Sequence, residues 1–399
     1  MSSHREISTD ETGSFASLPD EVICQILSLL PTKKVIAASI LSKRLRRLWN
    51  YIPALNFGNI KVKTLADNNR FNEFVDTLLF SRERAGSHSI DRFWLDIEYD
   101  YPYIAYHKSF PNVINWINYV VKQNVQFLNL TFSVVYDPGH TGPNLPISVF
   151  SCRTLVVLKL RWFSVEEDSC FNFVGFPSLK ALHLNDIYFD KYEDFLLLLG
   201  GCPVLEDLKV SDVYSFRTDP LDFDSSSLSK LNRAYIIGCR CDYWVKALSN
   251  LEYMRIQLWK GYHPTNFPIF HNLTHLVLNY NWDVVVEVLN HCPKLQNLDL
   301  YQNIRSDLDE DDYITEDDQD NWDEPTFVPQ CLSSYLRTCT IRDFAFAGLR
   351  RHLMLAGYIL KHAKVLETMI IWCNRERPGI ESILSSCAKA SATCQLSIY

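Results

Sequence analysis

Histidine and cysteine are numerous enough in this chain to raise the question of nucleophilic chemistry. The chain has 11 His and 12 Cys, and His291 directly precedes Cys292. A thiol nucleophile needs a base that faces it and a third group that orients the base. Adjacent residues seldom face each other, and the spacing suggests no third group. We therefore interpret His291 and Cys292 as the end of a helix entering a turn, and we expect no catalytic residue.

Metal binding is equally poorly supported by residue spacing. Cys239-Arg240-Cys241 is the one tight cysteine pair, and it has neither zinc-type spacing nor a second Cys/His pair at a suitable interval. Residues 307–324 carry eleven acidic side chains and no Lys or Arg. A calcium loop would need a central Gly and flanking helices, and this run has neither. We expect no metal and no cofactor.

The acidic run explains the overall charge of the chain. Without its eleven negative charges, the net charge of −8 becomes +3. We interpret residues 306–325 as a solvated insertion that self-repulsion keeps extended. The acidity thus belongs to one loop and not to the fold.

A repeated apolar pattern runs through most of the chain and predicts its fold. The pattern apolar-x-x-apolar-x-apolar returns from about residue 90, and between Leu155 and Leu295 it recurs every 20 to 26 residues. Helical return segments are expected at 192–200 and 283–291, and each leads into a Cys-Pro junction. One strand and one return segment per turn predict an α/β repeat solenoid in which neighbouring turns must stack to bury their apolar sides.

Alternation along the predicted strands places a set of polar and aromatic residues on the concave face. The set is moderately basic and carries Tyr and His, which suits an acidic peptide, an acidic metabolite or a phosphorylated segment of a target protein. A merely solvated sheet face explains it equally well, and no dense basic stripe predicts nucleic-acid binding. The candidate substrate-binding residues are Lys159, Arg161, His183, Lys209, Arg233, Tyr235, Arg255, His275 and Tyr301.

The N-terminal part contains three short predicted helices with more aliphatic surface than they can bury among themselves. The first runs from about Leu18 to Leu30 and stops at Pro31, the second holds Val35, and the third spans 39–49. About forty residues cannot enclose that much apolar area, so the excess predicts a docking face for another protein's helices.

The motifs in this part, Leu18-Pro19-Asp20-Glu21, the Leu-Leu-Pro-Thr-Lys turn at 29–33 and the run from Ser42 to Trp49, resemble an F-box. The resemblance implies binding to the Skp-type adaptor of Skp–cullin–F-box ubiquitin ligases. Leu45 departs from the family, which commonly has Trp there. The adaptor-binding residues that the resemblance implies are Leu18, Pro19, Val22, Ile26, Leu30, Pro31, Leu41, Leu45 and Trp49.

The C-terminal part resembles the FBD domain that often follows leucine-rich repeats in plant F-box proteins. The resemblance lies in Cys331-Leu332-Ser333-Ser334, Ile341-x-x-Phe344 and the segment from Tyr358 to Leu366, and His352 stands where the family usually has an acidic residue. The expected organisation is a disordered N-terminus at 1–14, an F-box at 15–60, an irregular leucine-rich-repeat horseshoe at 61–327, and an FBD-like region at 328–399.

Composition adds an expectation about location. No apolar run approaches the length of a membrane span, and the polar first residues have no secretory signal pattern. We expect a protein of the cytoplasm or nucleus, whose cysteines are reduced thiols.

We therefore expect a non-enzymatic substrate receptor of a ubiquitin ligase, which joins adaptor, cullin and RING subunits to a target protein. The alternative is a leucine-rich-repeat scaffold or small-ligand receptor that acts outside the ligase. Adaptor binding distinguishes the two.

Overall fold

The computed structural model describes residues 18–86, 89–135, 141–166, 175–217, 223, 228–239, 244–258, 267–279, 285–301, 325–344, 349–373 and 379–399. The chain divides into two compact units, Met1–Leu179 (unit 1) and Lys180–Tyr399 (unit 2). The predicted disordered N-terminus and the acidic run 307–324 lie outside the described residues. No helix among those described is long and apolar enough to cross a membrane.

Unit 1 begins with three short helices, α1 (Asp20–Leu27), α2 (Thr32–Ser39) and α3 (Lys43–Leu48), followed by a 3₁₀ turn, η1 (Trp49–Tyr51). They enclose a small core of Ile23, Leu27, Val35, Leu48 and Ile52. Two predicted boundaries are wrong. The first helix ends at Leu27, before the turn at Pro31, and the third begins at Lys43 because the Ser42 hydroxyl accepts a hydrogen bond from the Arg44 amide and caps the helix.

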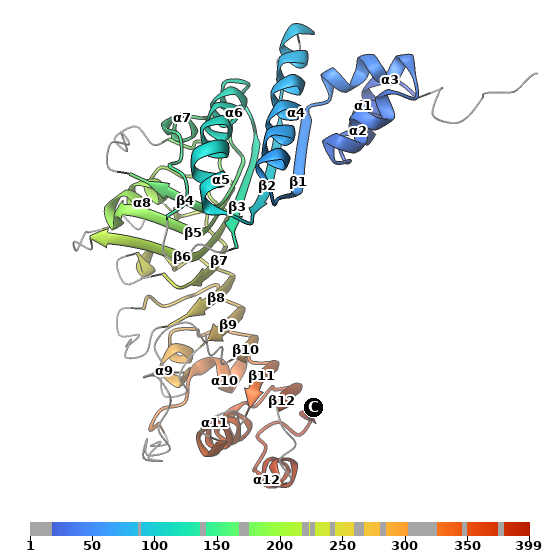
Figure 1. The fold of residues 1–399 in the computed structure, drawn as a ribbon. Helices are drawn as coiled ribbons and strands as arrows, with labels where there is room; N and C mark the ends of the chain where they lie inside the picture. Colours follow the sequence, from blue (N-terminus) through green and yellow to red (C-terminus); the bar gives the residue numbers. More distant parts are fainter. Residues whose placement is uncertain are drawn as a thin grey trace, which may run out of the picture. The chain divides into compact units, whose positions relative to one another are not determined.

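Four parallel strands follow in unit 1: β1 (Ala54–Val62), β2 (Arg92–Tyr99), β3 (Phe127–Val134) and β4 (Val157–Val165). The connecting helices are α4 (Leu65–Arg84), α5 (Pro102–Ile104), the π-helical turn η2 (Ala105–Ser109), α6 (Phe110–Lys122) and α7 (Ile147–Phe150). Figure 1 shows α4 and α6 running alongside the strands of this unit. Each strand is thus followed by a return segment, as a repeat solenoid requires.

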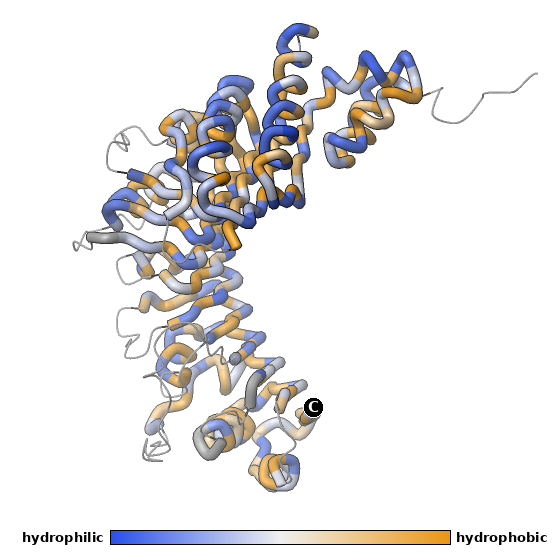
Figure 2. Tube along the Cα trace, in the orientation of Figure 1, coloured by the Kyte–Doolittle hydropathy of each residue, from blue (hydrophilic) through white to orange (hydrophobic). Residues whose placement is uncertain are grey.

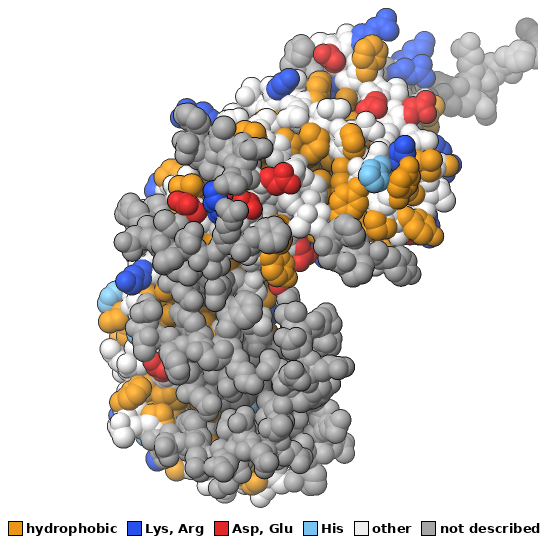
Figure 3. All heavy atoms as spheres, turned by 60° about the vertical axis from the view of Figure 1, so that its left-hand side comes forward, with side chains coloured by type: hydrophobic (Ala, Val, Ile, Leu, Met, Phe, Trp, Pro, Cys, Tyr) orange, Lys and Arg blue, Asp and Glu red, His pale blue; other side chains and the backbone are white. Residues whose placement is uncertain are grey.

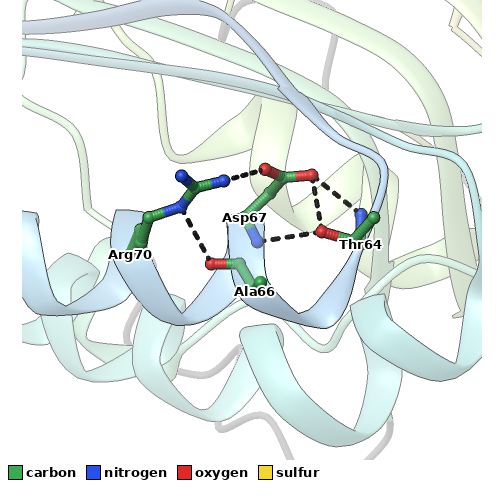
Figure 4. A network of polar contacts seen from close by, with 4 residues as sticks. All are labelled: Thr64, Ala66, Asp67 and Arg70. Atoms are coloured by element: carbon green, nitrogen blue, oxygen red, sulfur yellow. Dashed lines mark hydrogen bonds and ion pairs between the residues drawn. The ribbon is translucent and has the colours of Figure 1, made fainter.

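Helix α4 was not foreseen as a helix, although its start has a clear local signal. Thr64 accepts a hydrogen bond from the Asp67 amide at 3.1 Å, and the Asp67 carboxylate accepts one from the Thr64 amide at 3.0 Å (Figure 4). This capping box satisfies two amides that a helix N-terminus leaves without partners. Arg70 then binds the Asp67 carboxylate at 2.6 Å from the next turn.

Unit 2 continues the same alternation of strand and return segment. Its strands, all parallel to their neighbours, are β5 (Ala181–Lys191), β6 (Asp207–Arg217), β7 (Arg233–Ile237), β8 (Tyr253–Gln257), β9 (His275–Asn279), β10 (Asn297–Tyr301), β11 (Thr338–Phe344), β12 (Thr368–Cys373) and β13 (Gln395–Ile398). The return segments described are α8 (Tyr192–Gly200), η5 (Val245–Leu248), α9 (Val285–Asn290), α10 (Gln330–Ser334), α11 (Leu349–His362) and α12 (Ile380–Ser386). The helices predicted at 192–200 and 283–291 are α8 and α9, and Asp283 and Val284 lie outside the described residues.

The repeated apolar positions form the core of both units, as the alternating hydropathy along the strands suggests (Figure 2). In β5, for example, Leu182 and Leu184 are buried, while His183 and Asn185 are partly exposed on the other face. The described residues at the position where the repeat consensus has Asn, namely Phe163, Ile187, Val213 and Cys239, are also buried. Apolar filling therefore replaces a polar ladder there.

A left-handed residue precedes each of these four buried side chains. The φ angles are +64° at Trp162, +52° at Asp186, +56° at Asp212 and +59° at Gly238. Gly238 is required at its position, because a Cβ there would lie 2.3 Å from the Asp212 carboxylate. The left-handed residue kinks the strand end and directs the next side chain inward.

The Cys-Pro junctions close the return helices. The Cys202 thiol donates to the Leu198 carbonyl at 3.2 Å, and the Cys292 thiol donates to the Val288 carbonyl at 3.3 Å. Each buried thiol satisfies a carbonyl in the last turn of α8 or α9. The proline that follows cannot continue the helix, so the chain turns into the next strand.

Candidate functional site

The F-box-like helices present an apolar surface that their own core does not use. Six aliphatic side chains there are between 36% and 84% exposed: Val22, Ile26, Leu29, Leu30, Ile40 and Leu41. We call these six residues the apolar ledge. Val22 and Ile26 share one face of α1, and the buried Ile23 and Leu27 share the face beside it, because residues four apart lie above one another on a helix. A core filled by one set and an exposed second set is typical of a docking surface.

The predicted adaptor-binding residues divide into two groups in the structure. Val22, Ile26, Leu30 and Leu41 belong to the apolar ledge, while Pro19 and Pro31 are exposed at the starts of α1 and α2. Leu18, Leu45 and Trp49 are partly buried against the core of the three helices. Leu41 lies in the predicted third helix, 39–49, but outside α3. Leu29 and Ile40 belong to the ledge but were not among the predicted residues.

Arg44 fastens α3 to the start of the module. Its Nε donates to the Asp20 carboxylate at 2.7 Å, and its Nη2 donates to the Leu18 carbonyl at 2.5 Å. The two most distinctive motifs of the module, the one at 18–21 and the one at 42–49, are therefore joined directly.

Arg82 joins the same module to the rest of unit 1. This side chain lies at the end of α4 and is fully buried, and its Nη1 donates to the Ile52 carbonyl at 2.9 Å. Its Nη2 donates to the Ser89 carbonyl at 2.9 Å. Burial lowers the pKa of Arg82 to about 10, so the guanidinium remains charged at neutral pH. A charged hydrogen-bond donor thus links two points of the chain that are thirty positions apart, Ile52 and Arg82.

Unit 1 contributes two of the predicted substrate-binding residues, both on β4. Lys159 and Arg161 lie on the exposed sheet face, in register with Asn129 and Thr131 of β3. The Lys159 ammonium lies 5.8 Å from the centre of the Phe127 ring, a cation–π contact. These two residues belong to a different compact unit from the other seven candidates.

In unit 2, His183 lies beside an acidic residue. Its Nε2 is 3.7 Å from the Asp207 carboxylate of the next strand. The neighbouring imidazole is the largest influence that holds the pKa of Asp207 below its usual range, and Lys209 and Arg233 act in the same direction. Asp207 is therefore ionised at neutral pH and offsets part of the positive charge of this face.

Arg255 is held between two tyrosines on the exposed face of unit 2. Its guanidinium carbon lies 4.9 Å from the centre of the Tyr235 ring and 4.6 Å from the centre of the Tyr301 ring. Its Nε donates to the Tyr301 hydroxyl at 3.1 Å. Tyr235 and Arg255 are register partners on neighbouring strands, whereas Tyr301 reaches Arg255 across β9. The three predicted residues form one ordered stack.

The remaining predicted residues differ in their surroundings. Lys209 and Arg233 are exposed on β6 and β7, close to the stack in register. Both ring nitrogens of His275 have partners, the Thr274 hydroxyl at 2.8 Å and the Asn297 amide nitrogen at 2.9 Å. His275 is exposed and joins β9 to β10 through Asn297, and its part in a binding surface stays a prediction.

The same face continues into the FBD-like part, which sequence reasoning did not include. Arg342 forms an ion pair with Asp299 at 3.2 Å, and Trp372 stacks on Tyr399 with ring centres 4.7 Å apart. Trp372 is 45% exposed and Tyr399 63% exposed. Arg342, Trp372 and Tyr399 each follow the last in-register apolar residue of their strand, as Tyr301 does in β10. That shared position in the repeat could have revealed them.

Unit 1 has another exposed aromatic area, at α5 and η2. Tyr101 and Tyr103 are more than half exposed, the Tyr103 ring lies 5.1 Å from the His107 ring, and the Lys108 ammonium lies 5.9 Å from the Tyr103 ring. Figure 3 shows hydrophobic side chains gathered beside a histidine in its upper right. Three amide side chains, those of Asn68, Asn72 and Asn112, donate to the Lys108 carbonyl. They satisfy the carbonyl at a turn where the helix is irregular.

The chemistry weighed for His291 and Cys292 has no geometric support. Cys292 is fully buried and burial raises the pKa of its thiol well above the ordinary value, which disfavours a nucleophilic thiolate. His291 packs edge-on against Phe267 with ring centres 6.1 Å apart. Within the described ranges no three His, Cys, Asp or Glu side chains cluster as metal ligands would.

Comparison with known proteins bears on all three parts of the chain. The F-box domain model matches residues 15–54, the leucine-rich-repeat model described as "FBD-associated F-box protein At5g56370, LRR repeats" matches 113–248, and the FBD model matches 324–371. The chain is 29% identical to FBD-associated F-box protein At5g56370 of Arabidopsis thaliana, over 89% of each chain. It is 29% identical to the F-box/FBD/LRR-repeat protein At5g56420 of the same plant, over 96% of this chain and 97% of the relative.

The resemblance to plant-type F-box/FBD/leucine-rich-repeat proteins is thereby confirmed. The chain combines an F-box, leucine-rich repeats and an FBD segment, which fits a repeat fold. An F-box implies binding to a Skp-type adaptor, and together with leucine-rich repeats it implies a protein of a Skp–cullin–F-box ubiquitin ligase.

Proposed function

We propose that this protein is the substrate-receptor subunit of a Skp–cullin–F-box ubiquitin ligase. The three-helix F-box binds the adaptor, and through it the cullin and RING subunits, while the repeats form a horseshoe that holds a target protein. The observation that supports this most directly is the apolar ledge, because it remains exposed although the F-box helices have a filled core of their own.

The apolar area of the ledge favours association. Burying a fully exposed aliphatic side chain contributes about 1.5–3 kcal/mol. Leu29, Ile40 and Leu41 are mostly exposed, and the less exposed Val22, Ile26 and Leu30 add smaller contributions. Together they offset part of the entropy lost on binding, which costs about 4–15 kcal/mol. An apolar helical surface of the adaptor is the complementary partner that we propose for the ledge.

The proposed receptor performs no bond chemistry. It raises the effective concentration of a substrate lysine near a ubiquitin-charged enzyme held elsewhere in the complex. Proteins with an F-box and leucine-rich repeats are typically non-catalytic adaptors. In this chain the Arg82 hydrogen bonds fix the F-box against α4, which would transmit the adaptor's position to the first repeats.

Co-purification with a plant Skp-type adaptor tests the proposal. We expect the full-length chain to retain the adaptor, and a Val22→Asp/Ile26→Asp variant to lose it, because two carboxylates would be buried without partners. Leu65→Asp is the matched control, since Leu65 is also exposed, at 44%, but lies on α4. Undiminished adaptor binding by the double variant would leave a scaffold outside the ligase as the better function.

We also propose that the protein acts in the cytoplasm or nucleus. The ten described cysteines are free thiols, which fits a reducing compartment. Imaging a fluorescent fusion of the full-length chain tests this, and a signal confined to the secretory pathway would contradict it.

A further inference from the structure

We propose that Lys209, Arg233 and Arg255, grouped around Tyr235, dock a phosphorylated side chain of a peptide segment in the target protein. We call these three residues the cation cluster. The inference rests on the proposed receptor function, which it deepens by naming the chemical class of substrate and the place where it is recognised.

The strand register brings the three cations together. Lys209, Tyr235 and Arg255 are register partners on β6, β7 and β8, and Arg233 lies two residues before Tyr235 on β7. Register partners in a parallel sheet share a face, and neighbouring strands are about 4.8 Å apart. The three backbones therefore lie within about 10 Å of one another, and Tyr235 lies between Lys209 and Arg255 in the strand register.

The three cluster residues form no ion pair with a described carboxylate, unlike Lys180, Arg337 and Arg342 of the same unit. Lys180 pairs with Glu206 at 2.9 Å and Arg337 pairs with Glu367 at 2.6 Å. No described carboxylate lies within ion-pair distance of any of the three cluster residues. Charges that the fold has left without neutralising partners on one open face favour an anionic ligand.

Arg255 is preorganised for this role. Its guanidinium is stacked between the Tyr235 and Tyr301 rings, and its Nε is used by the Tyr301 hydroxyl. The two terminal amino groups have no described hydrogen-bond partner, and they form the edge that binds a phosphate in a bidentate manner. Since the stack already restricts the side chain, less conformational entropy is lost on binding.

The net charge of the site matches a phosphate better than a carboxylate. Three cations and the neighbouring Asp207 leave two net positive charges, and the pKa of Asp207 is lowered by His183, Lys209 and Arg233, so its charge persists at neutral pH. A phosphorylated side chain carries a charge of about −1.5 to −2 at pH 7. One carboxylate would neutralise only half of the excess.

The shape of the face favours a phosphate carried on a peptide over a free phosphate. The cluster lies on the exposed face of a sheet and not in a closed pocket, so an unattached anion would keep most of its water. Tyr235, Tyr253 and Tyr301 flank the cations on adjacent strands and are partly exposed. Their rings supply apolar contact for residues on both sides of a phosphorylated side chain.

The test uses the full-length chain and a degenerate seven-residue peptide library with a central phosphoserine, compared with the same library carrying serine or glutamate. We expect the phosphoserine library to bind at least tenfold more tightly than the other two. The Lys209→Gln/Arg233→Gln/Arg255→Gln variant should lose that preference, because each charge-assisted contact contributes about tenfold. The Lys180→Gln/Arg337→Gln variant should retain it, since those cations already have acidic partners.

Several outcomes would overturn the inference. These are equal binding of phosphoserine and serine libraries, equal binding of the glutamate library, an affinity for inorganic phosphate as high as that for the phosphopeptides, and an unchanged preference in the triple variant. Should the triple variant fail to fold, Lys209→Gln and Arg233→Gln alone alter exposed side chains and should each weaken phosphopeptide binding by about tenfold. Adaptor co-purification with the same variants separates the two proposals, because the F-box and the cluster lie in different units.

Discussion

Arg82 donates a hydrogen bond from Nη1 to the carbonyl oxygen of Ile52 at 2.9 Å, across thirty residues of chain. The bond joins the end of the F-box to α4 through a side chain that is completely buried. No sequence pattern marks this residue, since Arg82 follows a run of apolar helix positions that would suit a leucine. Its burial is nevertheless what connects the adaptor-binding module to the first repeat.

Replacing Arg82 with Met should destabilise unit 1. The substitution keeps much of the side-chain volume but removes the charge-assisted hydrogen bonds to the Trp49, Ile52 and Ser89 carbonyls, at a cost of about 3 kcal/mol. Arg84→Met is the matched control, because Arg84 is exposed in the same helix turn. Urea denaturation followed by far-UV circular dichroism measures both. Equal stability of the two variants would mean that the Arg82 bonds contribute nothing net.

Substitution of the two isoleucines of α1 should affect different properties of the protein, its stability in one case and adaptor binding in the other. Ile23 is 1% exposed and Ile26 is 38% exposed. Ile23→Ala should cost about 2–4 kcal/mol of stability by leaving a cavity in the small F-box core. Ile26→Ala should leave the melting temperature nearly unchanged and weaken adaptor binding instead. Calorimetry and adaptor titration distinguish the two effects, and a stable Ile23→Ala variant would contradict the assignment of the core.

The repeat architecture could be predicted because its signals are local. The apolar strand positions and the Cys-Pro junctions each lie within a few residues, and burial alone explains them. The capping box at Thr64 and Asp67 was an equally local signal for α4, but a search for the strand pattern alone passed over it. The predicted third helix began too early because Ser39 and Ser42 are both plausible caps, and only the fold shows which hydroxyl is used.

The candidate site was predictable only in part, since its decisive contacts are non-local. The alternation of inward and outward residues along each strand predicted that Tyr235, Arg255 and Tyr301 share one face. That they stack on one another depends on the register of the four strands β7 to β10, which the sequence does not show. The sequence could not show that His275 is engaged by its neighbours. The left-handed residues that precede the buried strand ends are also invisible in composition, because Trp162 and Asp186 do not favour that conformation as glycine does.

Stability should depend on pH through His352. Burial in α11 lowers the pKa of His352 to about 4 from an ordinary value near 6.5. Above pH 6.5 neither state is protonated and the full stability is present. As the pH falls from 6.5 to about 4, the unfolded state takes up a proton that the folded state does not, and stability falls by about 3 kcal/mol. Denaturation of wild type and His352→Leu across this range should show a smaller slope in the variant.

The buried thiols should resist alkylation in the native protein. Burial raises the pKa of Cys202 and of Cys331 to about 12, and raises the pKa of Cys339 further. A thiol without thiolate character reacts slowly. Brief treatment with iodoacetamide followed by peptide mass spectrometry should modify the partly exposed Cys387 before these three. Rapid native labelling of Cys202 would show that the end of α8 opens readily.

Arg255 should influence the titration of Tyr301. Burial raises the pKa of the Tyr301 phenol, and the hydrogen bond from Arg255 opposes that rise. Removing the guanidinium in Arg255→Met therefore should raise the pKa of Tyr301 further, because both the hydrogen bond and the nearby positive charge favour the phenolate.

Carbon-13 NMR of tyrosine labelled at Cζ measures the shift, with Tyr301→Phe identifying the resonance. Arg233→Met is the control, since Arg233 lies on β7, three strands from Tyr301, and it should produce a smaller change. An unaltered Tyr301 titration in Arg255→Met would mean that the stack does not persist in solution, and the preorganisation that we attribute to Arg255 would then be absent.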